Sequence, residues 1–126
     1  MRMQESGEMY LEAIYVLIQK NGNARSVDVS DYLGYSKPSV SRGVGILKKE
    51  GYVTVEADGT LVLTERGAEK AQKIYARHTL LTRVLTAIGV SPETAAADAC
   101  RLEHAVSDES FEALKKYAEK HFKEDN

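Results

Sequence analysis

Three side chains that can bind a metal ion lie close together in the sequence, at Cys100, Glu103 and His104. If this segment is helical, the spacings of three and four residues place the thiol, the carboxylate and the imidazole on one face. This set of donors suits a divalent transition metal better than calcium or magnesium, which prefer oxygen ligands. Because one helix cannot surround an ion, a site here needs side chains from other elements.

Two other segments offer such side chains. Met9 and Glu12 lie three residues apart near the start of the first expected helix and supply a thioether and a carboxylate. His78 lies on the apolar stripe of a later helix. Each has a simpler alternative role, since methionine fills gaps in a core and a buried histidine is more often hydrogen-bonded than metal-bound. The register of the cluster around residue 100 is the feature that favours metal binding.

Hydrophobic periodicity and capping residues predict the elements that position these side chains. The first part of the chain is predicted to form a helix over about residues 8–20, a short helix capped by Ser26 and ended by Gly34, a helix capped by Ser36, and a hairpin of residues 52–56 and 60–64. The second part is predicted to form a long helix over about residues 65–88 capped by Thr64, a helix from Ser91 to about Val106, and a last helix beginning at Ser107. The Asp58-Gly59 pair between the two β-rich runs is a strong hairpin signal.

A helix-turn-helix followed at once by a hairpin is the order of a winged helix, which binds DNA. The whole chain has a net charge of −2, but residues 36–50 hold four basic side chains and one acidic one, while residues 91–126 hold five basic and nine acidic. A basic helix on an anionic chain is compatible with reading DNA, although a short charge cluster alone also fits a solvated face. The predicted DNA contacts are Arg25, Ser36, Lys37, Pro38, Ser39, Ser41 and Arg42.

The fold class expected is mainly α. We expect a winged helix-turn-helix domain over residues 1–72 and an all-helical dimerisation and metal-binding domain over residues 73–126. The second segment is small for an independent core, so burial in a homodimer is expected. A chain of 126 residues is too short for a large catalytic fold, and we expect no enzyme. The single cysteine and the lack of a long apolar stretch favour a cytoplasmic protein.

At the level of motifs, the chain resembles the metal-dependent repressors that include the diphtheria toxin repressor and the manganese transport regulator. The resemblance rests on residues 8–15 (EMYLEAIY), 36–41 (SKPSVS), 77–81 (RHTLL), 99–104 (ACRLEH) and 107–109 (SDE). It implies an N-terminal winged helix that binds DNA and a helical segment that dimerises and binds metal. It also implies a short form, without the C-terminal SH3-like domain of longer members.

The same resemblance implies a set of metal ligands. The primary site of iron-responsive members matches Met9, Cys100, Glu103 and His104. Manganese-responsive members have Asp and Glu where this chain has Met9 and Cys100, and their further ligands match Glu12 and His78. The implied cofactor is a divalent transition metal, with Fe²⁺ favoured over Mn²⁺ because of the two sulfur donors.

The function that we predict is a metal-activated repressor of metal-uptake or homeostasis genes. Its expected partners are a double-stranded DNA operator and a second copy of the chain, with no membrane and no organic cofactor. Three alternatives stay open: a manganese-responsive regulator of the same family, a metal-independent winged-helix regulator with Cys100 as a redox sensor, and a small metalloenzyme or metal store. A pure dimerisation adaptor would leave the hairpin and the polar helix unexplained.

Overall fold

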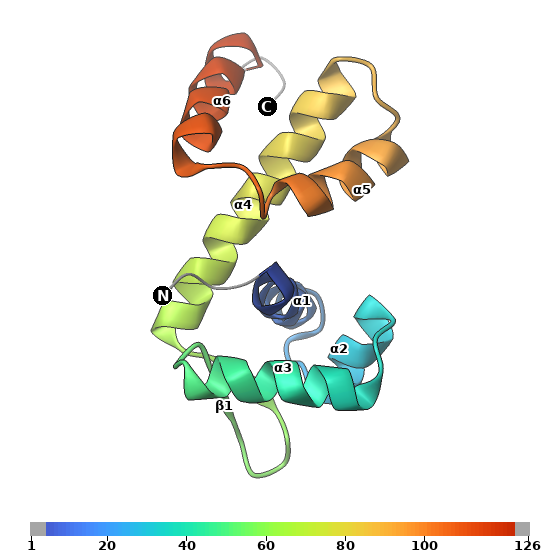
Figure 1. The fold of residues 1–126 in the computed structure, drawn as a ribbon, viewed down its shortest axis with the longest axis vertical. Coiled ribbons are helices and arrows are strands. Elements are labelled where there is room, and N and C mark those ends of the chain that lie inside the picture. Colours follow the sequence, from blue (N-terminus) through green and yellow to red (C-terminus); the bar gives the residue numbers. More distant parts are fainter. Residues whose placement is uncertain (1–4, 123–126) are drawn as a thin grey trace. The chain divides into compact units, whose positions relative to one another are not determined.

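The computed structural model describes residues 5–122 of the chain. Its elements are α1 (Glu5–Asn21), α2 (Ser26–Leu33), α3 (Lys37–Lys49), β1 (Val53–Val55), β2 (Leu61–Leu63), α4 (Glu65–Ala87), α5 (Pro92–Leu102) and α6 (Asp108–His121). The mainly helical class and the winged-helix order are thereby confirmed (Figure 1). The chain divides between Lys73 and Ile74, within α4, into two compact units. Within the described residues, no helix has the length and apolar character needed to cross a membrane.

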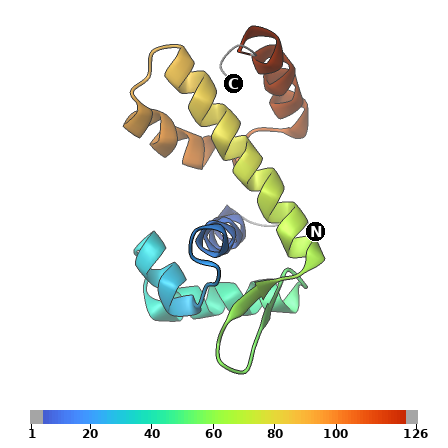
Figure 2. The same cartoon turned by 180° about the vertical axis from the view of Figure 1, so that it is seen from behind.

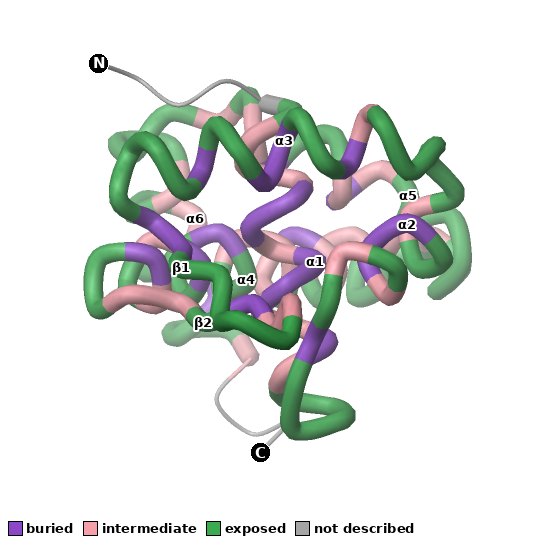
Figure 3. Tube along the Cα trace, turned by 90° about the horizontal axis from the view of Figure 1, so that it is seen from below, coloured by how far each residue is buried: buried purple, intermediate pink, exposed green. Residues whose placement is uncertain are grey.

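The core of the first unit lies among α1, α2 and α3. Its largest fully buried side chains include Leu11, Ile14, Val29 and Leu47, which come from all three helices. Figure 3 shows α3 alternating between exposed and buried positions along its length, as an amphipathic helix does. The helix therefore keeps one face in the core and leaves the opposite face to solvent.

The N-caps of α2 and α3 differ in how well the sequence predicts them. Ser36 caps α3 as expected, since its hydroxyl accepts a hydrogen bond of 3.3 Å from the N–H of Ser39. The predicted cap of α2 at Ser26 is wrong by one residue, because Ser26 is the first helical residue and Arg25 is the cap. The physical reason is Asp28, whose carboxylate accepts the N–H of Arg25 at 2.9 Å and so fixes the start of the helix one residue earlier.

A close contact between α1 and α3 depends on the absence of a side chain at Gly43. The Tyr10 ring is buried against this glycine, and a Cβ there would lie 2.3 Å from the ring. We expect Gly43→Ala to lower the free energy of unfolding by about 1–3 kcal/mol, as overpacking does. Urea denaturation measures the effect. Gly45→Ala is the control, because a Cβ at Gly45 meets no atom within 4 Å; equal destabilisation by both variants would contradict the argument.

The hairpin is shorter than predicted but lies where the sequence places it. β1 and β2 are antiparallel, with Val53 opposite Leu63 and Val55 opposite Leu61. The ladder ends at the pair of Val53 and Leu63. The next residue after β2, Thr64, forms the connection to α4, and its hydroxyl caps that helix by accepting the N–H of Gly67 at 3.0 Å. Figure 2 shows the hairpin extending from the rest of the first unit.

The second unit consists of the C-terminal part of α4 together with α5 and α6, which lie on either side of it (Figures 1 and 2). Ser91 and Ser107 cap α5 and α6 as predicted. The prediction that the helix from Ser91 continues to about Val106 is wrong, because α5 ends at Leu102. Glu103 and His104 therefore lie in the turn between α5 and α6.

Candidate metal centre and nucleic-acid interface

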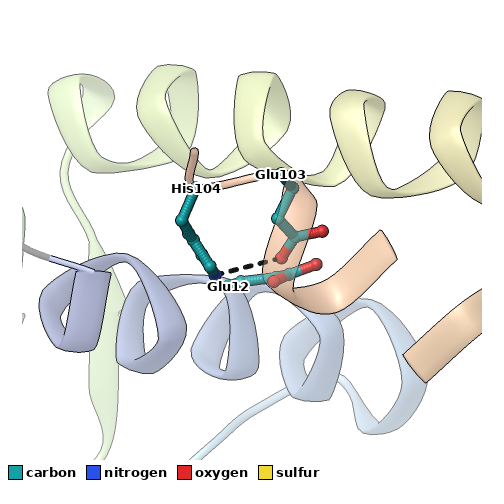
Figure 4. Close-up of side chains that lie close together, drawn as sticks. All are labelled: Glu12, Glu103 and His104. Atoms are coloured by element: carbon teal, nitrogen blue, oxygen red, sulfur yellow. Dashed lines mark ion pairs between the residues drawn. The ribbon is translucent and has the colours of Figure 1, made fainter. Parts of the chain in front are cut away.

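A buried carboxylate between two imidazoles is the centre of the candidate metal site. Glu103 is only 1% exposed. Its Oε2 lies 3.0 Å from Nδ1 of His78, and its Oε1 lies 3.3 Å from Nε2 of His104. Figure 4 marks the second of these pairs with a dashed line. A buried carboxylate is costly unless positive charge or hydrogen-bond donors compensate it, so this group indicates a cationic partner.

The geometry of Glu103 fits a bound cation. Among the described residues, none donates a hydrogen bond to the buried Oε1 of Glu103. A metal ion coordinated by this oxygen would satisfy it, and the neighbouring imidazoles are ligands that zinc, copper, iron and nickel also accept. The residues of this unit therefore fit a divalent transition metal better than a purely oxygen-bound ion such as magnesium.

The turn that carries these ligands is held by Arg77, a residue to which the sequence analysis assigned no role. Its Nη1 donates to the Glu103 carbonyl at 3.2 Å and also to the Val106 carbonyl, while its Nη2 pairs with the Asp108 carboxylate. These bonds satisfy carbonyl groups left open where α5 ends, so they explain why the chain leaves the helix there. In the sequence, the position of Arg77 next to the candidate ligand His78 was the signal that could have indicated this role.

We expect Arg77→Lys to weaken metal binding without removing a ligand. A lysine ammonium cannot reproduce the fork of a guanidinium, so at most part of the three-group contact survives. The apparent metal affinity should fall by roughly tenfold or more, as when a group that orients a metal ligand is lost. Isothermal titration calorimetry measures it. Arg101→Lys is the control, because Arg101 pairs with Asp98 on the exposed surface of α5. Equal metal affinity in wild type and Arg77→Lys would contradict the positioning role.

The remaining predicted ligands are distributed over both units. Cys100 is half-buried in the last turn of α5. The close group of possible ligand atoms found among the described residues includes Glu103 and His104 but not the Cys100 thiol. The three residues therefore do not form the predicted single helical face, because Glu103 and His104 both lie beyond Leu102, the last residue of α5.

Met9 and Glu12 lie on α1 in the first unit, both half-buried. The Met9 sulfur accepts a hydrogen bond of 3.8 Å from the Tyr35 hydroxyl. Glu12 is the third side chain drawn in Figure 4. Their spacing of three residues places both donors on one side of α1, as the sequence predicts.

The predicted DNA-contacting residues gather at the start of α3, with one exception. Lys37, Pro38, Ser41 and Arg42 are exposed there, and Ser36 precedes them as the N-cap. Ser39 is half-buried, and its hydroxyl accepts hydrogen bonds from Ser36 at 2.9 Å and from Arg42 at 3.3 Å. This small network holds the Arg42 guanidinium at the N-terminal end of the helix.

Arg25 is the exception, because it is the N-cap of α2 and contacts the hairpin rather than lying on α3. It forms a β-bridge with Thr60, and its guanidinium donates to the Asp58 carbonyl. At the tip of the hairpin, a hydrogen bond from the Thr60 N–H holds the pKa of the Asp58 carboxyl below its usual value. This tip therefore presents a carboxylate and a guanidinium side by side, so its net attraction for phosphate depends on Arg25.

The two halves of the chain match two family models. Residues 2–61 match the N-terminal DNA-binding domain of the iron-dependent repressors. Residues 64–125 match the metal-binding and dimerisation domain of the iron-dependent repressors. These matches cover the winged helix and the candidate metal ligands of the second unit.

Individual proteins of known sequence or structure agree with these matches. The chain is 37% identical over 120 residues to an HTH-type transcriptional regulator of Methanocaldococcus jannaschii, covering 94% of this chain and 96% of that protein. It is also 37% identical over 112 residues to the transcriptional regulator MntR of Escherichia coli O6:H1 (strain CFT073), covering 89% of this chain and 72% of that protein. The solved structure of the manganese regulator SloR is similar with a TM-score of 0.78 at 28% identity, over 91% of this chain and 54% of SloR, so the chain spans about half the length of that regulator.

Proposed function

Because this chain belongs to the family of metal-dependent transcriptional repressors, we propose that it is a metal-activated repressor of metal-ion uptake or homeostasis genes. It acts on a double-stranded DNA operator as a cytoplasmic homodimer, with residues 1–72 reading DNA and residues 73–126 binding metal and dimerising. The observation that carries this proposal is the buried Glu103 carboxylate between two imidazoles, within the part of the chain that matches a metal-binding domain.

In this proposal, Glu103, His104 and His78 hold the metal ion, and Cys100, Met9 and Glu12 supply further donors. When bound, the ion supplies the positive charge that compensates the Glu103 carboxylate. Since metal binding needs a deprotonated thiol and neutral imidazoles, the affinity is expected to fall as protons compete at lower pH. Met9 and Glu12 belong to α1, so their participation would make the conformation of the DNA-binding unit depend on the metal.

We favour Fe²⁺ as the physiological ion, with Mn²⁺ as the second candidate. The thioether of Met9 and the thiol of Cys100 are soft donors, which suit iron better than manganese. The similar proteins named as MntR and as a manganese regulator support the second candidate instead. The donor atoms of this chain are the more direct argument, because metal choice follows ligand chemistry.

Within the first unit, Tyr35 links Met9 to the start of the proposed DNA-reading helix. Its hydroxyl bonds the Met9 sulfur at 3.8 Å, and its carbonyl accepts the Ser30 hydroxyl at 2.6 Å. It directly precedes Ser36, the N-cap of α3. Tyr10, the neighbour of Met9, packs edge-on against the Tyr35 ring at 6.0 Å. A change in the position of Met9 would therefore be transmitted through Tyr35 to the N-terminus of α3.

We expect Tyr35→Phe to reduce the factor by which metal raises DNA affinity. The variant removes the hydroxyl but keeps the ring and its contact with Tyr10. Coupling between two sites is typically 1–3 kcal/mol, so a loss of roughly threefold or more in that factor is measurable by fluorescence anisotropy. Tyr32→Phe is the control, because it removes the same hydroxyl group from an exposed tyrosine of α2. A coupling factor that is the same in wild type and Tyr35→Phe would exclude this route.

We infer the homodimer from the apolar surface of the second unit. Ile88 is 71% exposed and Tyr117 is 57% exposed, while Ala95, Ala99 and Ala118 are among the buried side chains of this unit. A core that includes such small side chains buries little apolar area, and a second copy would cover the large exposed ones. Sedimentation velocity on the full chain tests this, and a monomer at micromolar concentration with and without metal would contradict it.

An anaerobic DNA-binding titration tests the function itself. The probe is a duplex selected by the protein from a random-sequence pool, first with Fe²⁺ and then with Mn²⁺ at matched free concentrations. Activation by Fe²⁺ at the lower concentration supports the iron assignment, and activation by Mn²⁺ alone would move it to manganese. Metal-independent binding that changes on oxidation of Cys100 would replace the proposal with a redox-sensing regulator.

A further inference from the structure

Two glycines lie two residues apart in α3, and only one of them has a role inside the protein. Gly43 is buried, and the Tyr10 ring occupies the space that its Cβ would need. Gly45 is exposed, and a Cβ there would meet no atom within 4 Å. Its φ is not positive, so the backbone conformation does not require glycine either. Glycine in a helix interior nonetheless destabilises the helix relative to alanine.

The position of Gly45 on the helix shows which surface it shapes. Pro38, Arg42, Gly45 and Lys49 follow one another at spacings of four, three and four residues, and all four are exposed. At 100° per residue they form one stripe, opposite to the buried face of α3. Gly45 therefore lies midway along the outermost line of this helix, between two basic side chains.

We propose that Gly45 is a positioning residue that lets the backbone of α3 approach the base edges in the major groove of DNA closely. This inference rests on the proposed function, in which α3 reads the operator. A side chain at position 45, midway along this stripe, would hold the helix axis away from the groove floor, whereas a glycine there allows backbone and bases to come into contact. DNA is the occupant because Arg42 and Lys49 flank the glycine with positive charge.

The inference predicts opposite effects of one substitution on stability and on DNA binding. Gly45→Ala should raise Tm by roughly 2–4 °C, since alanine favours the helix and has open space. The Kd for the selected duplex should rise by roughly tenfold, because the added methyl group weakens base contacts. Gly45→Leu should weaken binding further. The slope of log K against log salt should stay unchanged in both variants, because no phosphate contact is removed.

Fluorescence anisotropy with the selected duplex and a non-selected duplex of equal length, together with thermal unfolding, provides the test. Gly43→Ala is the matched control, because it should lower Tm where Gly45→Ala raises it. Arg42→Ala distinguishes the positioning role of Gly45 from the proposed function of the protein. If Arg42→Ala loses DNA binding while Gly45→Ala binds as wild type does, the positioning role is wrong and the proposed function stands. If neither variant changes binding, α3 does not read DNA and both fail.

Discussion

Glu103→Gln is expected to abolish metal-stimulated DNA binding while leaving the protein folded. The substitution keeps the size of the side chain but removes the negative charge that lies between His78 and His104. A neutral amide is a much poorer ligand for a divalent cation, so the apparent metal affinity should fall by roughly a hundredfold or more. Calorimetry measures metal binding, and fluorescence anisotropy measures the stimulation of DNA binding in the same protein.

The control for this variant is Glu112→Gln, an exposed carboxylate on α6. It changes the net charge equally, so a long-range electrostatic effect on DNA would appear in both variants. Circular dichroism shows whether Glu103→Gln stays folded. A folded Glu103→Gln protein with wild-type metal affinity would mean that the buried carboxylate serves the local structure only, and the candidate metal centre would have to be abandoned.

The order of the elements was predictable because each signal is local. The serine caps of α3, α5 and α6 and the Asp58-Gly59 turn act within a few residues, so the sequence contains all that determines them. The apolar residues Val40, Val44 and Leu47, spaced four and three residues apart, form the buried side of α3, so the helical period of the sequence alone defines that face. The same helical period places the basic side chains Arg42 and Lys49 on the opposite, exposed face of α3.

The details that were missed depend on contacts between residues distant in sequence. The end of α5 is determined by Arg77, which lies 26 residues before Glu103 and satisfies its carbonyl. Nothing within the segment from Ser91 to Val106 marks that end. The packing of Gly43 against Tyr10 is also long-range, and in the sequence this glycine looks the same as Gly45. Of the candidate ligands, His78, Glu103 and His104 are brought together within the second unit. A metal-binding role stays a prediction for these three as it does for Cys100, Met9 and Glu12.

The choice of metal gives the second prediction with a large expected effect. In the double variant Met9→Asp, Cys100→Glu, both sulfur donors become carboxylates, which suit harder ions such as Mn²⁺. The ratio of free Fe²⁺ to free Mn²⁺ needed for half-maximal DNA binding should therefore rise by roughly tenfold or more over wild type. Anaerobic titrations of DNA binding with each ion give this ratio directly.

Single variants separate the effect of losing a sulfur donor from the effect of gaining a carboxylate donor. Met9→Leu keeps the apolar volume of the half-buried side chain and removes only its donor atom, so the response to Fe²⁺ should weaken with no gain for Mn²⁺. Cys100→Ser replaces the soft thiolate by a weak oxygen donor and should act in the same direction. If all three variants keep the wild-type preference, neither sulfur is a ligand and the preference for iron loses its basis. Metal selection would then rest on Glu12, His78, Glu103 and His104, a set of oxygen and nitrogen donors that accepts manganese, and the metal would be assigned accordingly.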